Sequence, residues 1–203
     1  MAHVEKFTAR AVVNQIRHIE RQIEHPSNTD INPEKSDFNY SFVSRDISSY
    51  DYFLRRKSEL YCYGRDDVRL LGGWVVTVPK ELPSEQHRDF FEAVHEFLIN
   101  RYGGERNCVQ SIVHNDETTP HLHFLFIPTS TDTKHIQGEK ICMKDVINRQ
   151  ELRNFHPALQ KFIREKGFNV NLNSGITKEQ GNRSVWELKQ ERSHQYEYNR
   201  REW

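Results

Sequence analysis

The pattern of apolar and polar positions predicts a pair of central strands joined by a short turn. Residues 108–114 alternate in the manner of a strand, residues 121–128 form a second strand, and the polar residues 115–120 lie between them. A connection of six residues makes these strands antiparallel neighbours. A third strand is predicted over 68–78, with a bulge at its Gly-Gly pair and a stop at Pro79. Shorter extended segments are predicted at 2–8, 38–43 and 140–143.

Helical periodicity is clearest over 84–102, where the apolar side chains form one stripe and a Gly-Gly pair follows. A second helix is predicted over 148–167, with a cap formed by Asn148 and Glu151 and a kink expected at Pro157. Strands mixed with helices around a hairpin predict an α+β fold, with a central antiparallel sheet flanked by helices. Further helices are predicted over 9–24 and 48–60, and a loop over 25–36.

The length of 203 residues corresponds to one domain with an extension. We assign residues 1–183 to the domain and residues 184–203 to a helical extension. Ser184 and Glu187 resemble a capping box, and the charged helix that they open reaches Trp203 without a stop signal. The extension is therefore expected to be the start of a longer C-terminal region.

Charge and composition narrow the classes of protein that fit. Twelve Phe, eight Tyr and three Trp supply enough apolar surface for a core, which excludes wholesale disorder. Lys plus Arg and Asp plus Glu both number 29, so the formal net charge is zero and any nucleic-acid site must be local. The chain has no apolar run long enough for a membrane span and no secretory signal, which predicts a cytoplasmic location. Three widely spaced cysteines fit reduced thiols.

The candidate chemistry is concentrated where the two central strands meet. His121 and His123 are two residues apart on a strand, so their side chains project from the same face. His114 ends the preceding strand and can reach that face across the pair. Three neutral imidazoles that converge in this way form a metal site with open positions. Asp116 and Glu117, in the connecting turn, could orient the imidazoles or accept a proton.

The same residues allow other interpretations. His121 and His123 alone would also suit the exposed face of an edge strand, whereas His114, Glu117 and the apolar residues that follow His123 favour a metal site. Nitrogen ligands suit Mn, Zn, Fe or Ni better than an all-oxygen magnesium cage. A metal held by three histidines can serve nuclease or protease chemistry, but the chain lacks the helical His-Glu-x-x-His of zinc proteases. Phosphoryl transfer is therefore favoured.

Two blocks of sequence resemble a known family. The segment 114–128 resembles the signature of the HUH endonucleases, and more narrowly of the Pre/Mob (MobV) plasmid mobilisation relaxases, whose motif His-x-Asp-Glu-x-x-Pro-His-x-His it matches without departure. A second block is similar to the N-terminal motifs of that family. It comprises His18-Ile-Glu20-Arg21, His25, Asn28, Asp30-Ile-Asn-Pro33 and Asn39-Tyr40.

The resemblance implies a bacterial relaxase with the HUH fold that nicks and rejoins one DNA strand at an origin of transfer. It implies a covalent 5′-phosphohistidine at His18, a residue that spacing alone would leave as a solvated helix position. An acid such as Glu117 or Glu20 would orient the ring. The cofactor would be one divalent ion, with Mn²⁺ as the first choice and Mg²⁺ or another divalent ion as the alternative. The partners would be single-stranded and hairpin origin DNA, together with the conjugation coupling machinery in the full-length protein.

Four further residues are predicted to contact DNA. Arg17 and Arg21 could hold a phosphate, or could instead form salt bridges with neighbouring acids of the same helix. Asn39 and Tyr40 belong to the second block, and Tyr40 could stack on an unpaired base. Two rival functions stay open. One is a rolling-circle replication initiator, for which Tyr40, Tyr196 or Tyr198 would be the nucleophile, and the other is a non-catalytic DNA-binding regulator with a structural metal.

Overall fold

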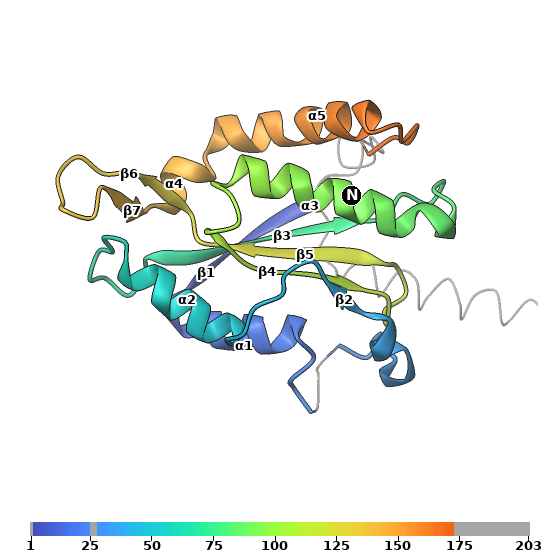
Figure 1. Cartoon of the computed structure of the whole chain (residues 1–203), viewed down its shortest axis with the longest axis horizontal. Coiled ribbons are helices and arrows are strands. Elements are labelled where there is room, and N and C mark those ends of the chain that lie inside the picture. Colours follow the sequence, from blue (N-terminus) through green and yellow to red (C-terminus); the bar gives the residue numbers. More distant parts are fainter. Residues whose placement is uncertain (1, 25–27, 173–203) are drawn as a thin grey trace, which may run out of the picture. The chain divides into compact units, whose positions relative to one another are not determined.

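A computed structural model of the chain describes residues 2–24 and 28–172. Its centre is a five-stranded, wholly antiparallel sheet with the strand order β1-β3-β5-β4-β2 (Figure 1). The strands are β1 (Ala2–Thr8), β2 (Tyr40–Ser41), β3 (Arg69–Thr77), β4 (Cys108–His114) and β5 (His121–Phe126). The predicted α+β class, the central hairpin and the flanking helices are confirmed.

Helices cover both faces of the sheet (Figure 1). On one face lie α3 (His87–Arg101) and α5 (Arg149–Glu165), and on the other lie α1 (Ala9–Ile19) and α2 (Ser49–Ser58). Successive strand residues point to opposite faces, so the four longer strands contribute to two apolar clusters. Trp74 and Phe124 join the cluster that includes residues of α3 and α5, whereas Leu71 and Leu125 join the one that includes residues of α1 and α2. The site described below lies on the α1 and α2 face.

The Gly-Gly pair in β3 marks close packing, where a bulge was expected. Gly72 to Thr77 pair with Phe126 to His121 in unbroken register. A Cβ atom on Gly72 would lie 2.6 Å from the Phe126 ring, and one on Gly73 would lie 3.0 Å from Leu125. The Phe126 side chain of β5 therefore leaves no room for a Cβ atom at Gly72 unless its ring shifts, and the fit at Gly73 is tight.

Several element boundaries differ from the sequence-based expectations. The first helix ends at Ile19 instead of residue 24, and a 3₁₀ helix, η1 (Pro33–Phe38), occupies part of the expected loop. Helix α5 continues through Pro157, because the proline and Arg153, whose carbonyl would lose its partner, are both exposed to water. The sequence did not predict β6 (Thr129–Thr131) or the short helix α4 (Met143–Val146). The first turn of the helix predicted over 84–102 is a separate 3₁₀ helix, η2 (Ser84–Gln86). The short strand expected at 140–143 is β7 (Glu139–Ile141), which pairs with β6.

The predicted extension over 184–203 lies outside the described residues. Within the described part of the chain, no helix has both the length and the apolar character needed to cross a bilayer.

Candidate metal centre and active site

The three histidines of the sequence motif converge on one face of the sheet. His121 and His123 lie on β5, which is flanked by β3 and β4, and each is 8% exposed. His114 lies directly opposite His121 in the β4–β5 register, so all three side chains share a face. The alternative of an exposed pair on an edge strand is therefore wrong.

Hydrogen bonds set the ring nitrogens of two histidines for metal binding. His114 Nε2 donates to the Ile19 carbonyl at 2.8 Å, which leaves the buried Nδ1 as a lone pair with no hydrogen-bond partner in the described chain. His121 Nδ1 donates to the Thr119 carbonyl at 2.8 Å and leaves Nε2 facing His123 Nε2 at 3.0 Å. One ligand atom from each of the three rings lies within 4.8 Å of the others. The residues present thus fit a metal ion, with carbonyl acceptors holding the ligand rings.

The surroundings keep the rings of His114 and His123 neutral. Burial lowers the pKa of His114 to about 4, and the nearby positive charge of Arg21 adds to the effect. Burial likewise holds the pKa of His123 well below its ordinary value, with a further contribution from its histidine neighbours. At neutral pH the imidazoles therefore keep the lone pairs that a metal ion requires.

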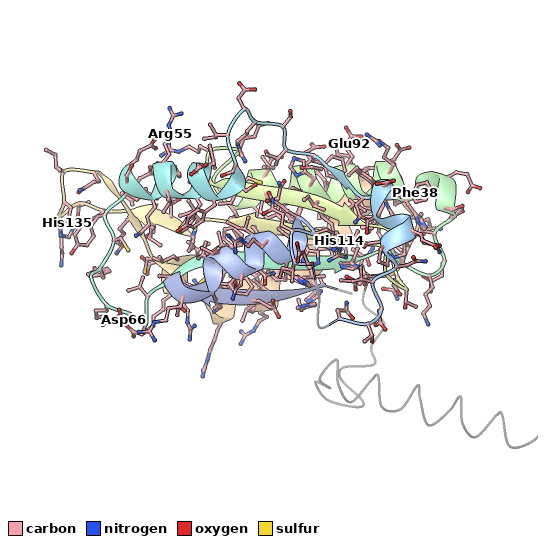
Figure 2. The ribbon with its side chains drawn as sticks, turned by 90° about the horizontal axis from the view of Figure 1, so that it is seen from below. Phe38, Arg55, Asp66, Glu92, His114 and His135 are labelled. Carbon is pink, nitrogen blue, oxygen red and sulfur yellow. The ribbon has the colours of Figure 1, made fainter. Side chains whose placement is uncertain are left out.

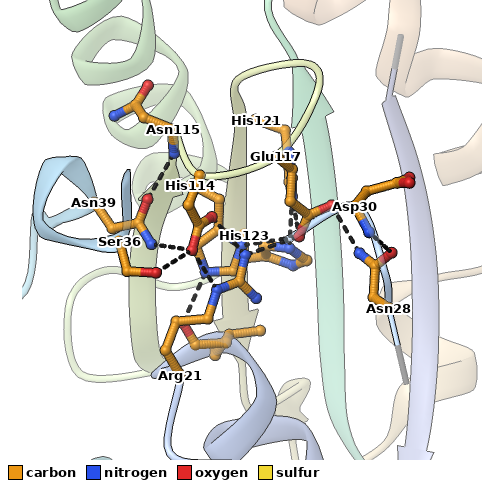
Figure 3. A network of polar contacts seen from close by, with 12 residues as sticks. Arg21, Asn28, Asp30, Ser36, Asn39, His114, Asn115, Glu117, His121 and His123 are labelled. Carbon is orange, nitrogen blue, oxygen red and sulfur yellow. Dashed lines mark hydrogen bonds and ion pairs between the residues drawn. The ribbon is translucent and has the colours of Figure 1, made fainter. Parts of the chain in front are cut away.

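Glu117 places one carboxylate oxygen beside the lone pairs. Its Oε1 lies 3.9 Å from His114 Nδ1 and 3.9 Å from His121 Nε2. The same oxygen accepts a hydrogen bond from Arg21 Nη2 at 2.8 Å, and Oε2 accepts one from Asn28 Nδ2 at 3.0 Å (Figure 3). Glu117 is thus anchored from two sides and faces the centre, a position that suits a further ligand or a group that orients whatever the centre binds.

Asp116 has a different role from the one considered from sequence. It is 1% exposed, and its carboxylate accepts four hydrogen bonds. The donors are Arg21 Nε at 2.8 Å, Arg21 Nη2 at 2.7 Å, Ser36 Oγ at 2.9 Å and Asn39 Nδ2 at 2.8 Å. Its carbonyl also accepts from the Asn32 amide at 2.8 Å. Asp116 therefore connects the end of α1, η1 and the β4–β5 turn.

Arg21 makes this connection from an unusual backbone position. Its φ of 56° is the only positive φ at a non-glycine residue in the described chain. The Arg21 amide donates to the His18 carbonyl at 3.2 Å, and the Gln22 amide donates to the Arg17 carbonyl at 2.8 Å. This is a Schellman motif with arginine where glycine is usual. Helix α1 ends here, and the Arg21 guanidinium points toward Asp116 and Glu117, which follow β4.

His18 lies in the last turn of α1, above the three histidines. Its ring is half-buried, stands nearly perpendicular to the His123 ring, and has its centroid 6.4 Å from the centroid of that ring. Burial, followed by the charge of Arg21, lowers the pKa of His18 below its ordinary value, so the neutral, nucleophilic form predominates at neutral pH. Glu20, one of the acids considered for orienting the ring, instead accepts hydrogen bonds from Ser49 and Gln110.

The predicted DNA contacts occupy different surroundings. The Arg21 guanidinium is paired with Asp116 and Glu117, and neither acid is one of the helix neighbours considered from sequence. Arg17 is exposed and has no ion pair within residues 2–24 and 28–172. Asn39 bridges the turn, since its side chain donates to Asp116 and accepts from the Asn115 amide at 2.7 Å.

Tyr40 lies on the opposite face of the sheet from the three histidines. It pairs with Val113, a residue of the α3 and α5 face, and the Arg88 guanidinium lies 4.8 Å from the centre of its ring. Burial raises the pKa of Tyr40 to about 12, so its hydroxyl stays protonated. Tyr196, Tyr198 and His25 lie outside the described residues.

The fold and the site define an α+β domain with three converging histidines that could hold a metal ion and a fourth histidine, His18, beside them. The sequence matches the plasmid recombination enzymes (Mob_Pre) over residues 1–197, so the chain belongs to this family.

Curated relatives support this assignment. The chain is 32% identical over 180 residues to a plasmid recombination enzyme of Streptococcus agalactiae, covering 84% of this chain and 35% of the relative. It is 29% identical over 198 residues to one of Lactiplantibacillus plantarum, covering 93% and 52%. The chain thus spans between about a third and a half of the length of these relatives.

A solved structure shares the fold. The Mn-bound MobM relaxase domain in complex with plasmid pMV158 oriT DNA, crystallised at pH 4.6, matches with a TM-score of 0.75 and 30% identity. The match covers 94% of this chain and 98% of that domain. The predicted MobV membership and relaxase fold are thereby confirmed.

Proposed function

We propose that this chain is the relaxase domain of a plasmid mobilisation protein. It nicks and rejoins one DNA strand at an origin of transfer through a covalent 5′-phosphohistidine on His18. The observation that carries the proposal is the position of His18, which stands 6.4 Å from His123, ring centre to ring centre, on the metal face. Tyr40 is on the other face, which disfavours it as the nucleophile. The expected place of action is the bacterial cytoplasm.

His114, His121 and His123 would hold one divalent ion, and Mn²⁺ is the first choice because the MobM relaxase domain is Mn-bound. An ion bound there would supply positive charge to a scissile phosphate. The three rings contribute neutral nitrogens, and Glu117, fixed by Arg21, orients the group that enters. Mg²⁺ would serve the same purpose with less suitable ligands, and another divalent ion that accepts nitrogen ligands would also serve it.

His18 would act as the nucleophile in its neutral form. The lone pair of a ring nitrogen attacks phosphorus, a P–N bond forms, and the bond from phosphorus to the 3′ oxygen breaks. The released 3′ oxygen takes up a proton. Attack by that 3′ hydroxyl on the phosphohistidine reverses these changes and reseals the strand, so no external energy source is needed. The substrate would be single-stranded or hairpin origin DNA, and the coupling machinery would engage the longer protein.

The test uses Mn²⁺ and single-stranded oligonucleotides that tile the replicon on which the gene lies. We expect one tile to be cleaved and its 5′ end to be linked to His18, as mapped by mass spectrometry. The adduct should be labile in mild acid because a P–N bond hydrolyses there, whereas a tyrosyl phosphodiester survives.

Variants separate the proposal from its rivals. His18→Ala should bind the cleaved tile but form no adduct. His156→Ala, which removes another half-buried histidine on α5, is the matched control and should form the adduct normally. An acid-stable adduct that remains in His18→Ala and is lost in a tyrosine variant would favour a replication initiator. Binding without cleavage of any tile would favour a regulator.

A further inference from the structure

Phe38 exposes its aromatic ring at the edge of the candidate active site. All twelve phenylalanines of the chain lie within the described residues, and Phe38, at 68% exposure, is the only one that is exposed. Its ring makes no aromatic or cation–π contact with the described residues, so packing within the fold does not account for it. Exposed apolar residues are common on proteins when scattered singly, and the surroundings of Phe38 must decide whether it has a use.

The backbone around Phe38 is firmly held. The Phe38 carbonyl accepts a hydrogen bond from Asn115 Nδ2 at 2.8 Å, and the Asn39 amide donates to the Ser36 carbonyl at 3.0 Å. The Ser36 and Asn39 side chains both donate to Asp116. The residues on either side of Phe38 thus fix its position, while its ring remains free, so little conformational freedom is lost when another flat group packs against it.

These hydrogen bonds also place the backbone of Phe38 next to the β4–β5 turn, which begins directly after the candidate ligand His114. Asn115, its partner, directly follows the candidate ligand His114 in sequence. Figure 2 shows the Phe38 side chain at the surface of the molecule, with His114 nearer the middle. A DNA strand whose scissile phosphate lies at the three histidines would place its neighbouring nucleotides over the residues that border the β4–β5 turn, and Phe38 is one of these residues.

The charges of η1 indicate which part of a nucleotide would lie there. The helix carries Glu34, Lys35 and Asp37, a net charge of −1. A phosphate would be repelled by the two acids, whereas an uncharged base can pack on the ring without bringing its phosphate close. Base stacking on an aromatic side chain is also tolerant of sequence, because every base has a π-face.

We propose that Phe38 is a stacking platform for one base of the single DNA strand next to the scissile phosphate. The proposal rests on the proposed function. It adds a DNA-contacting residue that lies outside the charged and histidine motifs and that contributes to affinity through stacking.

The experiment measures binding of the tile that the wild-type protein cleaves. In a series of oligonucleotides, 2-aminopurine replaces one base at a time on both sides of the nick, and fluorescence reports stacking. We expect one position to be quenched on binding to the wild type and restored in Phe38→Ala. The Kd of Phe38→Ala should rise by about 5- to 150-fold, the range set by the loss of one stacked base. Phe38→Trp should keep the quenching and bind within about threefold of the wild type.

Ile136→Ala is the matched control, because Ile136 is fully exposed and lies in the segment between β6 and β7, away from η1. Its Kd should equal that of the wild type. Unchanged Mn²⁺ affinity in Phe38→Ala shows that the variant is folded. Equal affinities of wild type and Phe38→Ala would overturn the stacking proposal alone if the wild type still cleaves its tile. A change in oligomeric state with unchanged DNA affinity would assign the ring to a protein contact instead. Failure of the wild type to bind any tile would overturn both proposals.

Discussion

Replacing Asp116 with asparagine tests the hydrogen-bond hub that connects α1, η1 and the β4–β5 turn. The variant keeps the shape of the side chain but removes the charge and turns one acceptor oxygen into a donor that faces Arg21. Loss of one member of a buried ion pair costs about 3–5 kcal/mol. We therefore expect the free energy of unfolding to fall by about 3–5 kcal/mol at pH 7, a large share of the roughly 5–15 kcal/mol typical of a domain.

The pH dependence of this effect has a definite sign. Burial alone would raise the pKa of Asp116, but hydrogen bonds from Arg21, Asn39 and Ser36 together outweigh it and hold the pKa below its usual range. A carboxyl whose pKa is lower in the folded state stabilises the fold above its unfolded pKa of about 3.9. That stabilisation is lost as the pH falls through the folded pKa. The difference between wild type and Asp116→Asn should therefore shrink as the pH decreases below about 4.

Urea denaturation of both proteins in EDTA, from pH 7 to pH 2.5, measures these differences, and the m-value should stay unchanged. Asp66→Asn is the control, because Asp66 forms an exposed ion pair with Arg10 and its loss should not measurably change stability. A loss below about 1 kcal/mol at pH 7, or a difference that is constant down to pH 2.5, would refute the argument that Asp116 is a buried, charged hub.

The remaining predictions concern the metal and the end of α1. His123→Ala should abolish Mn²⁺ binding in calorimetry, whereas His156→Ala should bind normally, and equal affinities would exclude the three-histidine centre. Because burial lowers the pKa of His114 to about 4, Mn²⁺ affinity should persist below pH 6 and be lost toward pH 4; half-loss near the ordinary histidine pKa of about 6.5 would contradict this. Arg21→Gly and Arg21→Ala lose the same ion pairs, but glycine tolerates the positive φ, so urea denaturation should find Arg21→Gly more stable by about 1 kcal/mol. Equal stabilities would mean that the backbone there is unstrained.

The sequence predicted the convergence of the three histidines because their geometry depends on short-range rules. Two histidines at positions i and i+2 of a strand must share a face, and a six-residue connection must bring His114 back to the same pair of strands. The burial of β5, which keeps the His123 ring neutral, also follows from the apolar residues after His123. These features require no knowledge of distant contacts.

The connections around the centre could not be predicted in this way. Arg21 takes a positive φ because its guanidinium reaches Asp116, 95 residues away in sequence, and nothing in the local sequence marks the end of α1. The role of Asn39 likewise depends on the Asn115 amide, which becomes its neighbour only in the folded chain. The predicted first helix was therefore too long, and for Asp116 only orientation of the imidazoles or acceptance of a proton was considered.

The ion pairs of Arg21 also bear on the exchange of segments between related proteins. The histidine block and the N-terminal block are joined by the Arg21 guanidinium and by the side chains of Asn28 and Asn39, so neither block contains all the residues that hold it in place. A chimera that receives residues 114–123 from a relative and keeps its own residues 18–39 would combine the two halves of this hydrogen-bond network from different proteins. An exchange of sequence between members of this family should therefore transfer both blocks together, because they form one structural unit from two separate parts of the chain.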